Sequence, residues 1–192
     1  MSSSPVPRVA FQGEHGAFSE EAAIKLLGHA IQLVPRTTFD ELFSSLAAGL
    51  ADYALAPIEN TLVGAIQPAV DLFAGSKLVI ADEIVIQIRQ QLIGCPGAVF
   101  EEIETIESHP AALGQCKRFF AAHPRIQAIA ADDTAGSVAQ IIKGGNRKRA
   151  AIAGRRAAEI YGGCVMRESL EDDQENYTRF LLLRSSSAES RR

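Results

Sequence analysis

Short apolar runs alternate with amphipathic stretches along most of the chain. Residues 8–11, 31–34 and 53–56 form such runs, and each is followed by a proline or a polar residue, which is typical of buried strands. The stretches between them begin with Ser, Thr or acidic residues and stop at glycine, which is typical of helices. Strand, turn and helix repeated with short links predict an α/β protein with parallel strands.

The same pattern predicts individual helices. Ser19 is expected to cap the first helix, and Thr38-Phe39-Asp40-Glu41 has the capping-box pattern that opens the second. In the second half of the chain the pattern predicts strands at 104–108, 126–130 and 150–153, and helices at 110–120, 135–142 and 155–161.

Residues 78–92 break this rhythm, because apolar and polar residues alternate there as in one long strand. We interpret this strand as a crossover from a first lobe to a second. If the apolar strand at 178–183 returns to the first lobe, the chain crosses twice and leaves a cleft. The expected fold class is therefore α/β, two lobes with a central cleft, with these bounds: one domain at 6–185, lobe 1 at about 6–77 plus 166–185, lobe 2 at about 78–165, and a disordered tail at 186–192.

Composition narrows the class of protein. The 192 residues are 47% hydrophobic and 22% charged, which is ordinary for a soluble globular protein. The net charge of −4 gives no reason to expect nucleic acid or membrane as a partner. No apolar run approaches the ~20 residues of a spanning helix, and the N-terminus has no signal-peptide pattern. Three widely spaced cysteines suit a reducing cytosol and argue against disulfides or zinc, so we expect a cytoplasmic protein.

Polar segments follow four of the predicted strands. They are residues 13–19, 57–61, 108–110 and 132–134. In open α/β sheets ligands bind at the carboxyl ends of strands, and free N–H groups at helix starts favour an anion. The four segments therefore indicate a protein that binds a small acid, and they are equally typical of turns and helix caps.

Several familiar chemistries are disfavoured. Gly13-x-x-Gly16 is neither the dinucleotide fingerprint nor a P-loop, which argues against a nicotinamide oxidoreductase. Ser108 has no adjacent base, which argues against a hydrolase, and the histidines have no metal-ligand spacing. The basic run at 147–149 is interpreted as a solvated loop, and Asp132-Asp133 as a turn.

The segment Asn176-Tyr177-Thr178-Arg179-Phe180 opens the last predicted strand. Its threonine could donate a proton to a leaving oxygen while its arginine holds a carboxylate. Taken alone, the segment favours the simpler interpretation of a terminal strand whose Thr and Arg side chains are solvated.

Together these segments resemble the prephenate dehydratase family, in its order and spacing, from about Arg8 to Leu183. The motifs that carry the resemblance are Gly13-Glu14-His15-Gly16-Ala17-Phe18-Ser19-Glu20, Pro57-Ile58-Glu59-Asn60-Thr61-Leu62-Val63-Gly64, Ser108-His109-Pro110 with Ala112-Leu113-Gly114-Gln115-Cys116, Asp133-Thr134-Ala135-Gly136, Ala151-Ile152-Ala153 and Asn176-Tyr177-Thr178-Arg179-Phe180. Thr61 stands where the family commonly has Ser, Ala111 where Gln is usual, and Gly114 where Ala is usual.

The resemblance implies a fold similar to type II periplasmic binding proteins, with prephenate as substrate and phenylpyruvate as product of L-phenylalanine biosynthesis. It implies Thr178 as the proton donor or its hydrogen-bond partner. Asn60, Ser108 and Gln115 are then polar catalytic contacts, and Arg179 is the candidate for carboxylate binding. The other residues assigned to the substrate site are Phe180, Ser19, Thr61, His109 and Thr134. No metal or organic cofactor is implied, and the family's catalytic domains usually form homodimers.

Three alternatives stay open at this point. Family members usually continue into a regulatory ACT domain, so the chain is either a catalytic domain alone or part of a longer protein. Arogenate dehydratase catalyses the same reaction on the amino-acid analogue. A binding or sensing module for a small acid would keep the fold without the catalysis.

Overall fold

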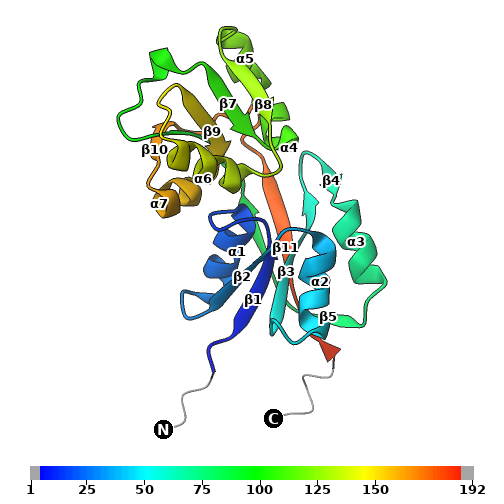
Figure 1. Ribbon diagram of the computed structural model, residues 1–192. Helices are drawn as coiled ribbons and strands as arrows, with labels where there is room; N and C mark the ends of the chain where they lie inside the picture. Colours follow the sequence, from blue (N-terminus) through cyan, green and yellow to red (C-terminus); the bar gives the residue numbers. More distant parts are fainter. Residues whose placement is uncertain (1–4, 187–192) are drawn as a thin grey trace. The chain divides into compact units, whose positions relative to one another are not determined.

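The computed structural model describes residues 5–186, which form two compact units (Figure 1). The first unit holds residues 5–13, 19–87 and 177–186, and the second holds residues 14–18 and 88–176. Each unit contains one mixed β-sheet with helices, which confirms the α/β fold class. Most of the predicted tail at 186–192 lies outside the described residues.

The sheet of the first unit has the strand order β2-β1-β3-β11-β5, and the short strand β4 pairs with β3. Helices α2 and α3 both contact β3. The bounds are β1 Arg8–Gln12, β2 Gln32–Arg36, β3 Tyr53–Asn60, β4 Gly64–Ala65, β5 Leu78–Gln87 and β11 Tyr177–Ser185, with α1 Phe18–Leu27, α2 Phe39–Ala47 and α3 Gln67–Ala74.

The sheet of the second unit has the strand order β10-β6-β9-β7-β8. Helix α6 has extensive contacts with β9 and α7. The bounds are β6 Gln91–Gly94, β7 Thr105–Ser108, β8 Gln127–Ala130, β9 Arg149–Ala153 and β10 Cys164–Arg167, with α4 Pro110–Gly114, α5 Lys117–Ala122, α6 Thr134–Gly144, α7 Arg155–Tyr161 and a 3-10 turn at Phe100–Glu102.

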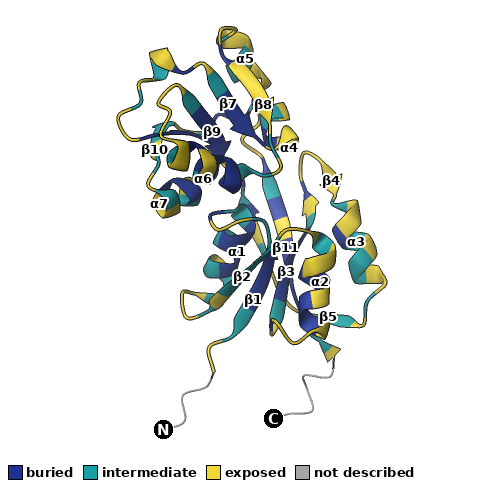
Figure 2. Cartoon of the chain, viewed as in Figure 1, coloured by how far each residue is buried: buried dark blue, intermediate teal, exposed yellow. Residues whose placement is uncertain are grey.

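Each sheet buries an apolar face against its helices (Figure 2). In the first unit the core joins α2 to the central strands, and its members include Ala10, Leu42, Phe43, Leu46, Ala54, Ala56, Leu181 and Leu183. In the second unit one side of the sheet packs on α6 and α7, with Ile93, Val138, Ile141, Ala151, Ala153 and Ala157 among its members. Because burial of apolar area is worth roughly 25 cal/mol per Å², these faces are the main source of stability of each unit.

Local signals set the helix boundaries that the sequence predicts. The Thr38 side chain accepts a hydrogen bond from the Glu41 N–H at 3.1 Å, and the Glu41 carboxylate accepts from the Thr38 N–H, so the capping box is confirmed. Ser19 is not the cap of the first helix, because that helix already begins at Phe18. The predicted helix at 110–120 is two short helices, α4 and α5, that meet at Gln115 and Cys116.

Strand pairing corrects the predicted course of the chain. The expected long strand at 78–92 is interrupted at 88–90, where the chain passes from the first unit to the second. Residues 78–87 belong to the first unit rather than the second, because β5 pairs with β11. Residues 166–176 belong to the second unit rather than to the first, because β10 pairs with β6 in the sheet of the second unit. The predicted parallel pairing holds among β1, β2 and β3 and among β7, β8 and β9. In contrast, β11 pairs antiparallel with β3 and β5, and β6 pairs antiparallel with β9 and β10.

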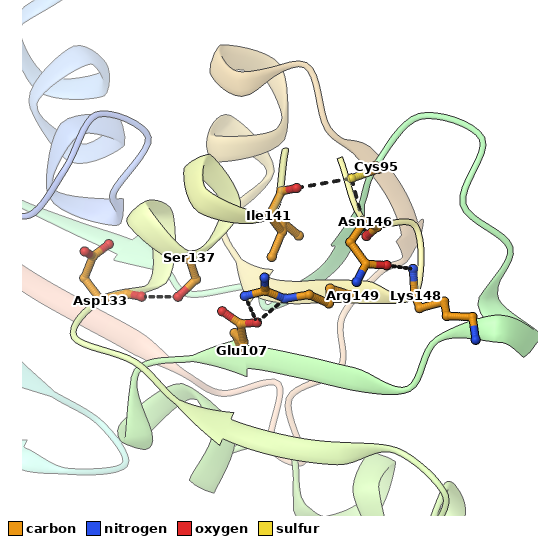
Figure 3. Close-up of polar contacts among 8 residues, drawn as sticks. All are labelled: Cys95, Glu107, Asp133, Ser137, Ile141, Asn146, Lys148 and Arg149. Carbon is orange, nitrogen blue, oxygen red and sulfur yellow. Dashed lines mark hydrogen bonds and ion pairs between the residues drawn. The ribbon is translucent and has the colours of Figure 1, made fainter. Parts of the chain in front are cut away.

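Polar contacts in the second unit involve residues that the sequence pattern assigned to loops (Figure 3). Arg149 is not in a solvated loop: it begins β9, and its guanidinium pairs with the Glu107 carboxylate, whose side chain is 7% exposed. Asp133 caps α6, where its carboxylate accepts from the Gly136 N–H and its carbonyl accepts from the Ser137 hydroxyl at 2.7 Å. The predicted turn at Asp132-Asp133 is therefore a helix cap.

Gly16 is required by both backbone conformation and space. Its φ is +90°, and a Cβ atom there would lie 2.7 Å from the Ala157 Cα in α7. We expect Gly16→Ala to lower the free energy of unfolding by on the order of 3 kcal/mol, because a left-handed backbone penalty adds to an overpacking penalty. Gly162→Ala is the matched control, since Gly162 has φ +72° and open space around its Cα. It should cost only about 1 kcal/mol. Similar losses for both variants in urea unfolding would contradict the close contact.

None of the helices in the described part of the chain is long and apolar enough to cross a membrane.

Candidate functional site

Asn60 and Thr178 are neighbours in the first unit although 118 positions separate them in sequence. Asn60 ends β3, Thr178 lies near the start of β11, and the two residues are paired in the antiparallel register. The Asn60 Nδ2 donates to the Thr178 Oγ1 at 2.9 Å, and each residue is 7% exposed. Two of the four expected catalytic residues are thus brought together by strand pairing.

The orientation of the Asn60 amide is fixed by its other hydrogen bonds. Its Oδ1 accepts from the backbone N–H groups of Leu62 at 2.9 Å and Val63 at 3.2 Å. Its Nδ2 also donates to the Tyr177 carbonyl at 3.1 Å. Because the Asn60 nitrogen faces Thr178, the Thr178 oxygen acts as an acceptor in this contact. The hydroxyl proton of Thr178 therefore stays available for donation to a ligand.

Thr61 holds the first residue of β11, Tyr177, in place. Its hydroxyl accepts from the Tyr177 N–H at 2.9 Å, and its own N–H donates to the Tyr177 carbonyl at 2.9 Å. The Thr61 side chain is thus the anchor of the residue that precedes Thr178.

Arg179 is not brought together with Thr178. Successive side chains of a strand point to opposite faces, and here Thr178 is buried while Arg179 is exposed. The Arg179 guanidinium pairs with the Glu83 carboxylate of β5, and this hydrogen bond and charge raise the pKa of Arg179 above its ordinary value. Carboxylate binding by Arg179 would require it to leave Glu83. Phe180 is a buried core residue, and Ser19 is buried in the first turn of α1.

The second unit contains a separate polar cluster around Gln115. The Asn176 Nδ2 donates to the Gln115 Oε1 at 3.0 Å, and Asn176 is fully buried. The Gln115 carbonyl accepts from the Asp172 N–H at 2.6 Å, so the backbone is held as well. Asn176 was assigned no separate role from the sequence. Its position in the segment Asn176-Tyr177-Thr178-Arg179-Phe180 was the one feature that could have indicated a role in the site.

The remaining expected site residues of the second unit have structural contacts. Ser108 is fully buried, and its hydroxyl donates to the Ile152 carbonyl of β9 at 2.6 Å. The His109 Nδ1 accepts from the Ala111 N–H at 3.2 Å, as the N-cap of α4. Thr134 is the first residue of α6, which Asp133 caps. A substrate contact of Ser108 would therefore require its hydroxyl to be shared or moved.

The site residues include no activated nucleophile. Burial raises the pKa of the Cys116 thiol to about 12, and the negative charges of Asp172 and Glu171 add to the shift. At neutral pH this thiol stays protonated and is inert as a nucleophile. Residues 5–186 also contain no group of three or more His, Cys, Asp or Glu side chains that could hold a metal ion.

The fold and these clusters define a class: a mixed α/β protein of two units in which the Asn60–Thr178 and Gln115–Asn176 clusters are built from uncharged hydroxyl and amide groups. A sequence model of the family described as prephenate dehydratase matches residues 9–188. The chain belongs to the prephenate dehydratase family.

Individual relatives agree with this assignment. The chain is 39% identical over 176 residues to "Arogenate dehydratase/prephenate dehydratase 1, chloroplastic" of Arabidopsis thaliana, covering 92% of this chain and 44% of that protein. Among solved structures, the prephenate dehydratase from Arthrobacter aurescens in complex with L-Phe is 29% identical with a TM-score of 0.85, covering 94% of this chain and 61% of the other. A structure described as GqqA, a novel type of quorum quenching acylase, is 28% identical with a TM-score of 0.83, covering 93% and 64%. The chain spans about half the length of the curated relatives it matches.

Proposed function

We propose that the chain is a carbon–oxygen lyase that converts prephenate to phenylpyruvate, with Thr178 as the hydrogen-bond or proton donor to the departing hydroxyl. The observation that carries this proposal is the contact from the Asn60 Nδ2 to the Thr178 Oγ1. It makes the threonine oxygen an acceptor on one side and leaves its proton for the substrate. The dehydratase reaction of this family needs such a donor, because the departing hydroxyl must take up a proton to leave as water.

The reaction asks little covalent chemistry of the protein. The ring carboxylate leaves as CO2, and the electrons of its C–C bond enter the ring as the C–O bond to the hydroxyl breaks. The hydroxyl takes up a proton and leaves as water, and the ring becomes aromatic. A donor at the leaving oxygen lowers this barrier, and assistance of this kind is typically worth ~10²–10⁴ in rate.

The other polar residues are proposed to place the substrate. The Asn60 amide orients Thr178, and the Gln115 amide supplies N–H donors for a substrate oxygen. Contacts from Ser108, Ser19, Thr61, His109, Thr134, Arg179 and Phe180, a homodimeric assembly and a cytoplasmic location are further parts of this proposal.

Turnover by the purified chain tests the proposal directly. We expect prephenate to yield phenylpyruvate, and arogenate is tested beside it because the Arabidopsis relative is named for both substrates. Faster turnover of arogenate to phenylalanine than of prephenate to phenylpyruvate would identify the chain as an arogenate dehydratase. Calorimetric binding of either compound without turnover would instead support a non-catalytic small-acid module.

Acyl transfer, the activity named for the GqqA structure, lacks support in the contacts of this chain. A hydroxyl nucleophile needs an adjacent base to take its proton. Among the described residues, the Thr178 hydroxyl has only the Asn60 amide as a hydrogen-bond partner, and the Ser108 proton is donated to a backbone carbonyl.

A further inference from the structure

The Gln115 amide oxygen in the second unit receives two hydrogen bonds. The Asn176 Nδ2 donates to the Gln115 Oε1 at 3.0 Å, and the Gln90 Nε2 donates to the same oxygen at 3.2 Å. With both acceptor positions of Oε1 in use, the amide cannot turn over without losing two bonds. The Gln115 Nε2 has no partner among the described residues, and the side chain is half-buried. Its two N–H donors are therefore held ready for a ligand.

Gln90 is itself held from several sides. It is 2% exposed, and its backbone N–H donates to the Glu171 Oε2 at 2.8 Å. The Gln90 carbonyl accepts from the Leu170 N–H at 2.9 Å. Asn176 is also fully buried, so neither donor to Gln115 has room to move away. The orientation of the Gln115 amide is thus determined by buried groups rather than by solvent.

This arrangement carries a cost in stability. The Gln90 Oε1 is buried and has no hydrogen-bond partner among the described residues, and the same holds for the Glu171 Oε1. A buried polar atom without a partner destabilises a fold, and an apolar side chain at position 90 would avoid that penalty. The presence of a glutamine at position 90, despite this penalty, is explained if the hydrogen bond from its Nε2 to the Gln115 Oε1 is needed for function.

We propose that Gln90 is a positioning residue, which holds the Gln115 amide with its N–H donors toward the substrate. This inference rests on the proposed dehydratase function. A prephenate or arogenate molecule carries carboxylate and hydroxyl oxygens, so an outward-facing donor suits it and an outward-facing carbonyl would repel it. Gln90 touches no reacting atom and acts through Gln115.

The kinetic test compares Gln90→Met with Gln91→Met. Methionine keeps the length of the side chain and removes the donor. Gln91 is the matched control, because it is 3% exposed and has a buried Oε1 without a partner among the described residues, but its Nε2 donates to the Arg89 carbonyl instead. We expect Gln90→Met to lower kcat/KM by about tenfold, mainly through a higher KM, and Gln91→Met by less than about twofold.

A double-mutant cycle separates positioning from general loss of structure. In a Gln115→Ala background, Gln90→Met should lower kcat/KM by no more than about twofold, since the group that it positions is gone. Full additivity of the two changes, or equal losses in Gln90→Met and Gln91→Met, would overturn the proposal.

An amide NMR readout keeps the inference separate from the proposed function. The Gln115 side-chain NH2 signals are assigned by their loss in Gln115→Glu, which retains an acceptor for Gln90 and Asn176 and should fold as stably as the wild type. Those signals should shift in Gln90→Met and stay in place in Gln91→Met. If the Gln115 signals shift in Gln90→Met but the wild type has no turnover, the proposed function alone is contradicted. If the wild type has turnover but the signals do not shift in Gln90→Met, or if Gln115→Glu is unfolded, the positioning role alone is contradicted.

Discussion

Thr178→Val is expected to bind substrate and to lose most of its turnover. Valine has nearly the shape of threonine, so the buried position stays filled and the Asn60 Nδ2 keeps its second acceptor, the Tyr177 carbonyl. The variant should therefore fold, with a stability loss of about 1 kcal/mol for the missing hydrogen bond. Because the donor to the leaving oxygen is gone, kcat should fall by ~10²–10⁴ while KM changes little. Steady-state kinetics with the preferred substrate, together with thermal unfolding, measure both effects.

Two companion variants make this result specific. Thr178→Ser keeps the hydroxyl and should retain kcat within about tenfold, since one missing methyl group disturbs packing only slightly. Thr105→Val is the matched control, because the Thr105 Oγ1 is buried without a hydrogen-bond partner among the described residues and its loss removes no contact. Turnover of Thr178→Val at the wild-type rate would remove the hydroxyl from the mechanism.

Asn60→Asp is expected to reduce kcat on the order of 10³-fold, a size within the range of general acid assistance. The introduced carboxyl keeps an acceptor for the Leu62 and Val63 N–H groups. Its second oxygen faces Thr178 where the amide nitrogen stood, so the threonine proton turns toward the carboxylate and away from the substrate. The same oxygen faces the Tyr177 carbonyl without a donor between them, which should also lower the free energy of unfolding by about 1–3 kcal/mol.

Acidity gives this variant a distinctive signature. Protonation of the introduced carboxyl restores a donor toward Thr178, so the loss of kcat relative to wild type should shrink as pH is lowered. Asn146→Asp serves as the control, because the Asn146 Oδ1 accepts from the Lys148 N–H in an exposed loop of the second unit. A kcat for Asn60→Asp within twofold of wild type across pH would show that Asn60 does not orient the donor.

Much of the local structure was predictable because its causes are local. The capping box at Thr38 and Glu41 depends on residues three positions apart, and the helix forms where the pattern indicates. The short apolar runs became strands for the same reason. The two-residue β4 was missed because so short a strand has no periodicity to detect, and β10 was missed although β7 and β8, which are also four residues long, were predicted.

Contacts between distant segments were not predictable in this way. Arg149 looked like part of a basic loop, but the parallel pairing of β7 with β9 brings it to the buried Glu107. Arg179 looked like a carboxylate ligand beside Thr178, but strand alternation turns it to the opposite face and toward Glu83. In both cases the partner of the charge lies on another strand, and no pattern within one segment specifies it.

The sequence by itself determined the α/β class, the order of most elements and, through its spaced motifs, the family. Those properties follow from short-range periodicity and from residue identity. Only the tertiary structure decided that β11 enters the first sheet antiparallel between β3 and β5, in the register that sets Thr178 against Asn60. It also decided the direction of each amide, in Asn60 and in Gln115, because that direction depends on donors and acceptors supplied by distant parts of the chain.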